Sequence, residues 1–289
     1  MVALDVVIVS YQCREMLREC LDSLRAHAPS EPMQVFVVDN GSTDGTIEMV
    51  RDEYQEVDLT PLARNLGFSA ANNIAIRKGR GEHVLALNPD TIVLSGTLDH
   101  MLGLMRSRPD VGIAGCQLEL PDGGFDHAAK RSFPTPLSAL AHFSGVGRRE
   151  GAPAQLAQYR APDVERGEVD AVNGAFMLMR RADLEKIGLF DEAYWMYMED
   201  LDLCFRFQAA GWVNWFEPNV SVMHVKAGTS GKLRAPKLNA AFHYGMFRFY
   251  RDHYASERNP AVNGAVYAGI LTKLGMSLVA VAVRRRRRL

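Results

Sequence analysis

Asp90 is at the end of a predicted strand, where its carboxylate can be exposed and bind a ligand. It follows Asn88 and Pro89 at the end of the apolar run 83–88. Proline fixes φ and lacks a backbone donor, which projects the next side chain beyond the strand. A single exposed carboxylate can coordinate Mg²⁺ or Mn²⁺ that is bridged to a diphosphate. The pattern therefore suggests a metal site, although Asn-Pro-Asp is also typical of a plain turn.

Glu199 and Asp200 open a predicted helix, directly after the bulky apolar stretch 194–198. Acidic residues in a first turn complement the helix dipole, which is the purely structural interpretation. Beside such bulky side chains a carboxylate is also partly desolvated, and desolvation raises its pKa. A raised pKa suits a general base, so we expect a catalytic role for this pair.

Asp39 and His224 each end an apolar run. Asp39 is followed by a turn rich in Gly, Ser and Thr. Its carboxylate can accept a hydrogen bond from the N3–H of a uracil or thymine ring, or it can simply cap the next helix. His224 precedes a segment that contains Ser230 and Lys232, which suit phosphate binding. An isolated histidine is also commonly structural.

The elements that carry these residues alternate between strand and helix. Predicted strands cover 4–10, 34–39, 57–63, 83–88 and 111–118, and predicted helices cover 13–27, 43–54, 68–78 and 95–107. Alternation of this kind predicts an α/β fold, a mostly parallel sheet with helices on both faces. Ligands of such sheets bind at the carboxyl ends of the strands. That rule selects Ser10-Tyr11, Asp39-Asn40, Asn88 to Asp90 and the neighbourhood of His224.

The second half of the chain is less regular. Residues 119–168 are rich in Pro, Gly, Ala and Arg, which predicts a long insertion or mobile loop. Strands are then expected at 169–181 and 212–225, and helices at 182–187, 200–210 and 235–255. We expect an α/β domain over 1–228 and a C-terminal helical extension over 229–289.

The composition and the motifs of the chain exclude several classes of protein. With 47% hydrophobic and 23% charged residues, the chain of 289 residues is neither disordered nor collagen-like nor a multi-span membrane protein. The fingerprints of dinucleotide, P-loop and esterase sites are missing, and the folded region has no nucleic-acid signature. The N-terminus resembles a first strand rather than a signal peptide, and the four cysteines suit buried thiols in a reducing cytoplasm.

The positive charge is concentrated at one end. The formal net charge is -1, but residues 284–288 are all arginine, so the rest of the chain carries -6. The preceding segment 261–283 contains one charged residue, Lys273. We place Lys273, Ser277 and Arg284 on one face of a helix and Val266, Ile270, Leu274 and Leu278 on another. That pattern predicts a helix lying in a membrane interface, with the arginines on anionic headgroups. The alternative is a helix packed on the domain.

Seven segments, in order, resemble glycosyltransferase family 2, which has the GT-A fold. They are VVIVSYQ, VVDNGSTDGT, ARNLGFSAANN, LALNPDT, VNGAFMLMRR, FDEAYWMYMEDLDLCFR and VMHVKAGTSG, within residues 4–255. The FDE…YMEDLDL…AGW run and the Asn-Pro-Asp variant are most similar to the rhamnosyltransferase branch. That branch includes enzymes that act on polyprenyl-diphosphate-linked acceptors.

The resemblance implies roles for individual residues. Asp200, with Glu199 beside it, matches the catalytic base. Asp90 and His224 match the metal ligands, with Asn88 in place of the first aspartate of the family's DXD motif. The positions that match nucleotide-sugar contacts are Ser10, Tyr11, Asp39, Arg64, Asn65, Gly67, Asn72, Asn88, Asp90, Ser230 and Lys232. Asn173 and Gly174 match the acceptor-side strand, and Trp195 matches the aromatic wall near the donor sugar.

The resemblance also implies an activity. It predicts an inverting, Mg²⁺- or Mn²⁺-dependent glycosyltransferase that moves rhamnose from dTDP-rhamnose to a saccharide or polyprenyl-diphosphate-linked acceptor for envelope polysaccharide. A UDP-hexose donor is the alternative. Two other classes are a nucleotidyltransferase, which lacks support because SYQCREML has no Gly/Lys signature, and a non-catalytic nucleotide-sugar-binding protein. The expected location is the cytoplasmic face of the plasma membrane.

Overall fold

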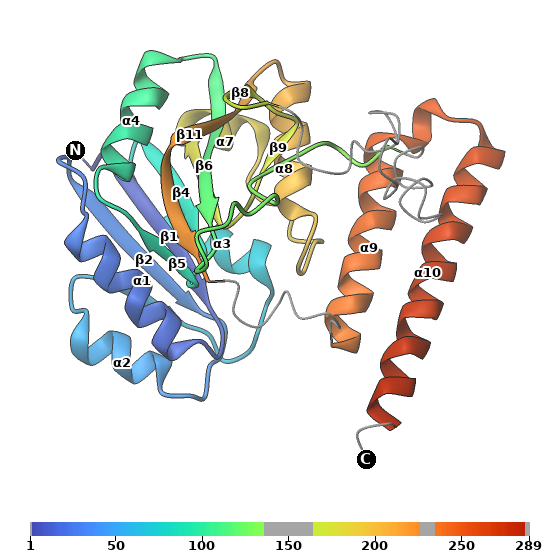
Figure 1. The fold of residues 1–289 in the computed structure, drawn as a ribbon, viewed down its shortest axis with the longest axis horizontal. Coiled ribbons are helices and arrows are strands. Elements are labelled where there is room, and N and C mark those ends of the chain that lie inside the picture. Colours follow the sequence, from blue (N-terminus) through green and yellow to red (C-terminus); the bar gives the residue numbers. More distant parts are fainter. Residues whose placement is uncertain (1, 136–163, 226–234, 287–289) are drawn as a thin grey trace.

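A single large sheet organises the computed structural model, which describes residues 2–135, 164–225 and 235–286 (Figure 1). The strand order is β3-β2-β1-β4-β10-β6-β11-β5, and β8 pairs with β11 beside this path. The strands are β1 (Leu4–Ser10), β2 (Met33–Asp39), β3 (Asp58–Pro61), β4 (His83–Leu87), β5 (Thr91–Val93), β6 (Val111–Glu119), β8 (Gly167–Glu168), β10 (Phe176–Arg180) and β11 (Val213–His224). Strands β1 to β4, β6 and β11 share one direction, which confirms the predicted mostly parallel sheet.

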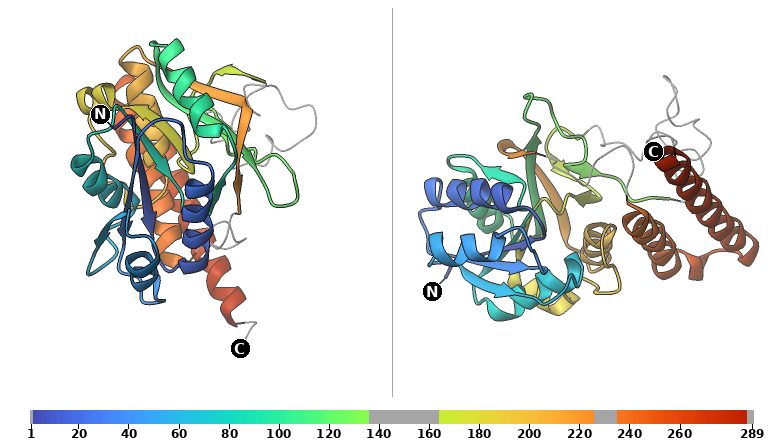
Figure 2. Two further views of the ribbon diagram at one scale, coloured as in Figure 1. Left: turned by 90° about the vertical axis from the view of Figure 1, so that its left-hand side faces the viewer. Right: turned by 90° about the horizontal axis from the view of Figure 1, so that it is seen from below.

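The centre of the sheet explains its apolar sequence. Every residue of β1 and β4 is buried, as expected for parallel strands covered on both faces. Helices α1 (Arg14–Ala26) and α2 (Thr46–Glu53) lie on one face and α3 (Phe68–Lys78) on the other (Figure 2). Leu17, Leu21 and Leu24 of α1 point into the core. The four cysteines are free and buried, as predicted.

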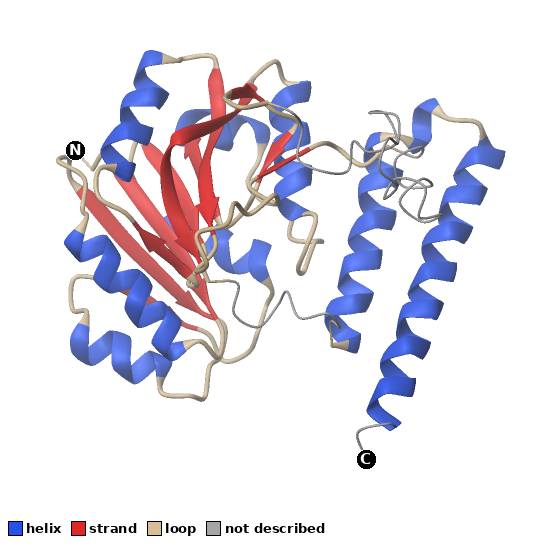
Figure 3. Ribbon diagram, viewed as in Figure 1, coloured by secondary structure: helices blue, strands red, loops and turns tan. Residues whose placement is uncertain are grey.

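The remaining helices follow the predicted order. They are α4 (Thr97–Ser107), α7 (Arg181–Ile187), α8 (Glu199–Ala209), α9 (Pro236–His253), the short 3₁₀ helix η2 (Ala255–Glu257) and α10 (Pro260–Arg286). Figure 3 shows α9 and α10 side by side, as a pair next to the sheet and its helices. This pair is the predicted C-terminal helical extension.

The segment 119–168, predicted to be one long loop, is structured at both ends. Strand β7 (Lys130–Arg131) pairs with β9 (Ala171–Val172) in a small second sheet, and β8 joins the main sheet through β11. A bridge between Glu119 and Phe125 closes a tight turn after β6. These pairings join residues that are distant in the sequence, and they leave no periodic pattern of apolar residues. The composition of the segment therefore predicted a loop.

The outward face of α10 differs from the prediction. Ile270 is buried, and Ser277 accepts a hydrogen bond of 2.8 Å from Asn239 of α9, so residues of both predicted faces lie on the side of α10 that packs on α9. The exposed side carries apolar residues instead, with Leu271, Met276 and Val279 at 68%, 70% and 62% exposure. A contiguous apolar surface of this kind marks an interaction face.

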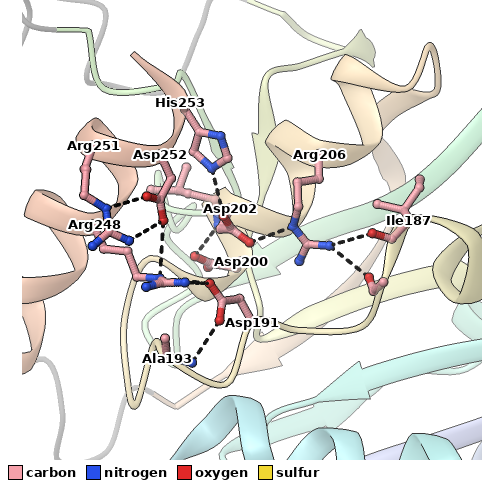
Figure 4. Close-up of polar contacts among 12 residues, drawn as sticks. Ile187, Asp191, Ala193, Asp200, Asp202, Arg206, Arg248, Arg251, Asp252 and His253 are labelled. Carbon is pink, nitrogen blue, oxygen red and sulfur yellow. Dashed lines mark hydrogen bonds and ion pairs between the residues drawn. The ribbon is translucent and has the colours of Figure 1, made fainter. Parts of the chain in front are cut away.

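Polar contacts join α9 to α8 and to the loop that precedes α8 (Figure 4). Asp202 of α8 accepts from His253 of α9 at 2.8 Å and from Arg206 at 2.8 Å. Burial opposes ionisation of Asp202, but the His253 hydrogen bond and the Arg206 charge outweigh it and lower the pKa of Asp202. Arg248 of α9 also pairs with Asp191 at 2.6 Å. The helix that begins with Glu199 and Asp200 is thus joined directly to α9.

We expect Asp202→Ala to lower the free energy of unfolding by about 3–5 kcal/mol, because it removes the buried carboxylate that pairs with Arg206 and hydrogen-bonds to His253. Asp252→Ala is the matched control, since Asp252 is a partly exposed carboxylate on α9 whose loss should cost about 1 kcal/mol or less. Urea denaturation at pH 7 measures both. Equal losses for the two variants would contradict the role assigned to Asp202.

Candidate active site

The strand register gathers the predicted residues at one edge of the sheet. Ser10 pairs with Asp39, and Ile8 pairs with Leu87, so β1 and β2 end at the same level and β4 ends slightly earlier at the same edge. Phe176 is opposite Leu87 in the antiparallel strand β10, which brings the residues just before β10 to that edge. Thr91 pairs with His224, the last residue of β11. The polar residues that follow these strands therefore surround one site.

Asp39 lies fully buried at the centre of this edge. Its Oδ2 accepts hydrogen bonds from the hydroxyls of Ser10 and Ser42, and its Oδ1 accepts from the backbone N–H of Gly41 and Ser42. A carboxylate offers about four acceptor sites, and all are in use. The contact between Asp39 and a pyrimidine stays a prediction, and it requires a serine hydroxyl to give up its bond. Tyr11 is 51% exposed at the same edge.

Asn40 holds the loop that precedes α3. Its side-chain amide donates to the carbonyl of Gly67 at 3.2 Å, and its Oδ1 accepts from Leu66 at 3.1 Å. Asn65 Oδ1 accepts from Gly67 at 2.9 Å, which tightens the same loop. In the sequence, Asn40 stands out only as the neighbour of Asp39. Arg64 is exposed beside this loop.

Gly67 and Trp195 are in direct contact. Gly67 has φ of +94°, and a Cβ there would lie 2.3 Å from the Trp195 carbonyl oxygen. Only glycine fits, because both the conformation and the contact exclude a side chain. The ammonium group of Lys237 also lies over the Trp195 ring, 3.8 Å from the ring centroid. Asn72 is buried and donates to the Phe68 carbonyl within α3, so its side chain serves the helix.

His224 lies between two carboxylates. Its Nε2 is 3.5 Å from Asp90 Oδ1 and its Nδ1 is 3.1 Å from Asp126 Oδ2. Burial disfavours the charged ring, but the hydrogen bonds to Asp126 and Asp90 outweigh it and raise the pKa of His224 to about 9. Asp90 and His224 therefore meet as predicted. Asp126 was missed because it lies in the segment predicted to be a loop.

The donor set at Asp90 and His224 fits a divalent cation. Asp90 Oδ1 is buried and has no hydrogen-bond partner within the described ranges, apart from its ion pair with His224. Carboxylate and imidazole ligands together suit Mn²⁺, and carboxylate with water suits Mg²⁺. No group of three or more acidic, His or Cys side chains in the described part of the chain is arranged to hold a metal ion. A cation at this site would be coordinated by two protein ligands, Asp90 and His224, and by a bound substrate.

Asp200 is paired but keeps one acceptor site. Its Oδ2 accepts from Arg131 and from the backbone N–H of Gly174 at 3.2 Å, and its Oδ1 accepts from the Leu201 N–H at 2.8 Å. Three bonds on a carboxylate leave one lone pair, on Oδ1. Asn173 uses its side chain to fix the neighbouring turn, accepting from Ala175 at 2.8 Å. Gly174 and Asp200, predicted separately, are thus in contact.

Arg131 is a second residue that the sequence analysis missed. Its guanidinium contacts both Asp200 and the carbonyl of Val172. It lies on β7, which the β7–β9 pairing carries to the start of α8. Nothing in the local pattern around Arg131 signals this contact. Ser230 and Lys232, predicted to contact a diphosphate, lie outside the described residues, and Asn88 contributes its backbone N–H to Ala175.

Glu199 is a buried carboxyl group whose Oε2 has no hydrogen-bond partner among the residues the structure describes. Burial, reinforced by the charge of Asp200, raises the pKa of Glu199 to about 8. It follows Tyr197 and Met198, which both have positive φ, 71° and 73°. Such a conformation costs about 1–3 kcal/mol per residue, and it turns the chain sharply into α8. The raised pKa favours the protonated form of Glu199 at neutral pH, next to the ion pair of Asp200 with Arg131.

Replacing Glu199 with Gln should stabilise the fold increasingly as pH rises. Between the unfolded pKa of 4.5 and the folded value of about 8, the native state holds a proton that the unfolded state has lost, so stability falls with pH. Gln carries no such penalty. We expect the difference in Tm between Glu199→Gln and wild type to grow by on the order of 5 °C from pH 5 to pH 9. Exposed Glu48→Gln is the control, and a pH-independent difference would contradict the buried acid.

The chain is similar to known glycosyltransferase sequences. A family profile described as "Glycosyltransferase like family 2" matches residues 3–241. An N-acetylglucosaminyl-diphospho-decaprenol L-rhamnosyltransferase of Mycobacterium tuberculosis is 33% identical over 265 residues, which cover 87% of this chain and 85% of the relative. The rhamnosyltransferase WbbL of Escherichia coli K12 is 25% identical over 214 residues, which cover 71% of this chain and 77% of the relative.

Solved structures share the fold at low sequence identity. Residues 1–349 of Staphylococcus aureus TarS match with a TM-score of 0.58 and 16% identity, covering 93% of this chain and 70% of that one. The mannosyltransferase PcManGT of Pyrobaculum calidifontis, solved with GDP-Man and Mn²⁺, also matches with a TM-score of 0.58, at 17% identity, covering 97% and 75%. Both the predicted fold and the predicted enzyme class are therefore confirmed. The chain belongs to glycosyltransferase family 2, has the GT-A fold and resembles the rhamnosyltransferase branch of that family.

Proposed function

We propose that the protein transfers a sugar from a nucleoside diphosphate to an acceptor hydroxyl with inversion, using Asp200 as the general base. The observation that carries this proposal is the single open lone pair on Asp200 Oδ1 at the edge where the strands end. A general base must be within hydrogen-bond reach of the proton that it removes. Glu199, being neutral, does not compete for that proton.

The donor side is formed by the β1 and β2 ends and the loop before α3. Exposed Tyr11 and Arg64 flank the loop that Asn40 and Asn65 fix, and we assign the nucleotide and diphosphate to these positions because they match the family's motifs. Trp195 is the wall next to the sugar. Because uracil and thymine share the same N3–H edge, Asp39 serves either base.

Asp90 and His224 are the residues that hold Mg²⁺ or Mn²⁺ in this proposal. When bound, a divalent cation offsets the negative charge that grows on the nucleoside-diphosphate leaving group. Imidazole binds metal in its neutral form, so loading the site releases the proton that the raised pKa of His224 keeps on the ring. Ser230 and Lys232 are assigned to the same diphosphate.

The acceptor side is the turn at Asn173 and Gly174 next to Asp200. Because the relative from M. tuberculosis carries N-acetylglucosaminyl-diphospho-decaprenol in its name, we assign a polyprenyl-diphosphate-linked saccharide as acceptor and dTDP-rhamnose as donor. That assignment implies a role in envelope polysaccharide synthesis. A UDP-hexose is the second candidate donor, since TarS has been solved with UDP-GlcNAc. Product mass from a donor panel with a lipid-linked acceptor distinguishes the two.

Asp200→Asn should lower kcat by about 10³-fold or more, since an amide cannot remove the acceptor proton. The affinity for the nucleoside diphosphate should persist, because Asp200 lies on the acceptor side. Release of nucleoside diphosphate with and without acceptor measures the first quantity, and calorimetry with UDP or dTDP measures the second. Near-normal turnover would refute the base. A wild-type protein that binds a nucleotide sugar but releases nothing would favour the non-catalytic class.

The helix α10 is the proposed membrane contact. Within the described ranges, Pro260–Val281 is the helix that is long and apolar enough to cross a bilayer by length and composition. It packs on α9 along one side, through Ile270 and Ser277, while Leu271, Met276 and Val279 are exposed. A helix that packs on α9 between Asn263 and Ser277 suits the interface rather than a span. The arginines at 284–288 then meet anionic headgroups on the cytoplasmic face of the plasma membrane.

Replacing residues 284–288 with serine should release the protein from vesicles that contain 30% phosphatidylglycerol, because each arginine contributes about 1 kcal/mol near an anionic surface. The triple variant Leu271→Ser, Met276→Ser, Val279→Ser should also weaken binding. Sedimentation measures the bound fraction, with phosphatidylcholine vesicles as the control. Release of the wild type by about 1 M NaCl is expected for an interfacial helix. Undiminished binding of both variants would refute the anchor.

A further inference from the structure

Asp126 touches the candidate metal ligand from the side opposite Asp90. Its Oδ2 lies 3.1 Å from His224 Nδ1, whereas Asp90 Oδ1 lies 3.5 Å from Nε2 of the same ring. Asp126 is 2% exposed and His224 is 7% exposed. The imidazole is therefore held at both nitrogens by carboxylates that come from different parts of the chain.

The backbone holds Asp126 firmly in this place. Its N–H donates to the Leu118 carbonyl at 2.9 Å, and the bridge between Glu119 and Phe125 closes the turn just before it. Its second carboxylate oxygen, Oδ1, accepts from the Ala128 N–H at 2.9 Å. Asp126 thus presents one oxygen to the turn and the other to His224.

The arrangement has a specific consequence for metal binding. A histidine that binds a metal through one nitrogen donates the other N–H to a carboxylate, which fixes the ring and makes the ligand more basic. Here Nδ1 is the nitrogen that faces the buried carboxylate, so Nε2 is left toward Asp90. Asp126 is too buried to contact a substrate directly, and among the described residues His224 is the site residue that it contacts.

We propose that Asp126 is a positioning residue that locks the His224 ring with Nδ1–H toward itself and directs Nε2 toward Asp90 and a divalent cation. The inference rests on the proposed function, because it presumes that Asp90 and His224 hold Mg²⁺ or Mn²⁺. It adds a residue from the segment 119–135 to a site that the strand ends otherwise build. A purely structural ion pair between Asp126 and His224 is the competing explanation.

The test measures Mn²⁺ affinity rather than turnover. Electron paramagnetic resonance counts free Mn²⁺ during titration of the full chain, in separate arms with saturating UDP and dTDP. Asp126→Ala should raise the Kd for Mn²⁺ about 10- to 100-fold. Asp126→Asn should fall between Ala and wild type, since its one oxygen must serve both the Ala128 N–H and His224. Asp122→Asn removes an exposed carboxylate from the same turn and should leave the Kd unchanged.

A double-mutant cycle separates positioning from a general loss of structure. In a His224→Gln background, Asp126→Ala should cause no further loss of Mn²⁺ affinity, because the residue acts through the missing ring. Thermal unfolding confirms that each variant is folded. Equal Mn²⁺ affinity of wild type and Asp126→Ala, or additive losses in the cycle, would overturn the role of Asp126 alone. Wild-type protein that binds Mn²⁺ in neither arm would overturn the metal site itself, and this inference with it.

Discussion

The parallel, in-register pairing of β1 with β2 and β4 is the constraint on which the site depends. Ser10 is level with Asp39 and Ile8 with Leu87, so the polar residues after these strands emerge along one line. A slip of one residue would reverse the side chains of a whole strand and send them into the core. The buried apolar runs of β1 and β4 disfavour such a slip, because sliding either strand along its axis would carry the polar residues that follow it into the apolar centre of the sheet. The packing of the core thereby fixes the relative positions of the polar residues at this edge.

The second constraint is electrostatic. Acidic side chains with little exposure gather near this edge: Asp39, Asp90, Asp126, Glu199 and Asp200. An unpaired buried charge is costly, so each of these carboxyl groups is stabilised by a different set of neighbours or by its own proton. Asp39 uses local hydroxyl and backbone donors, Asp200 uses Arg131, and Asp90 and Asp126 share His224. Glu199 has no cation and keeps its proton. Different compensation gives chemically similar groups different properties, and in the proposed function this allows one edge to hold a nucleotide contact, a base and a metal ligand.

The C-terminal helices extend the same network away from the sheet. Helix α8 begins with Glu199 and Asp200, and two residues later Asp202 binds His253 of α9. Helix α9 in turn packs against α10, which exposes apolar residues on its outward face. An acceptor with a lipid tail must be reached at the membrane surface, and a rigid connection from α8 to α10 would hold the base at a fixed position relative to that surface. The contact at Asp202 thus joins the proposed chemistry to the proposed membrane attachment.

Much of the fold was predictable because its signals are local. Alternating apolar runs and amphipathic helices set the elements, and the strand-end rule placed Asp39, Asp90 and His224 at one edge. The positions of Asp126 and Arg131 were not predictable, since both lie in a segment without period and reach their partners through pairings such as β7 with β9. The face of α10 was also misjudged, because Ser277 finds a partner in Asn239 that no helical pattern reveals.

The sequence by itself thus determined which residue types stand at the ends of the strands. Only the tertiary structure decided which carboxylate is saturated, which is neutral and which keeps an open lone pair. The physical reason is that hydrogen bonding and desolvation depend on neighbours distant in the chain, whereas strand and helix formation depend on neighbours close in it.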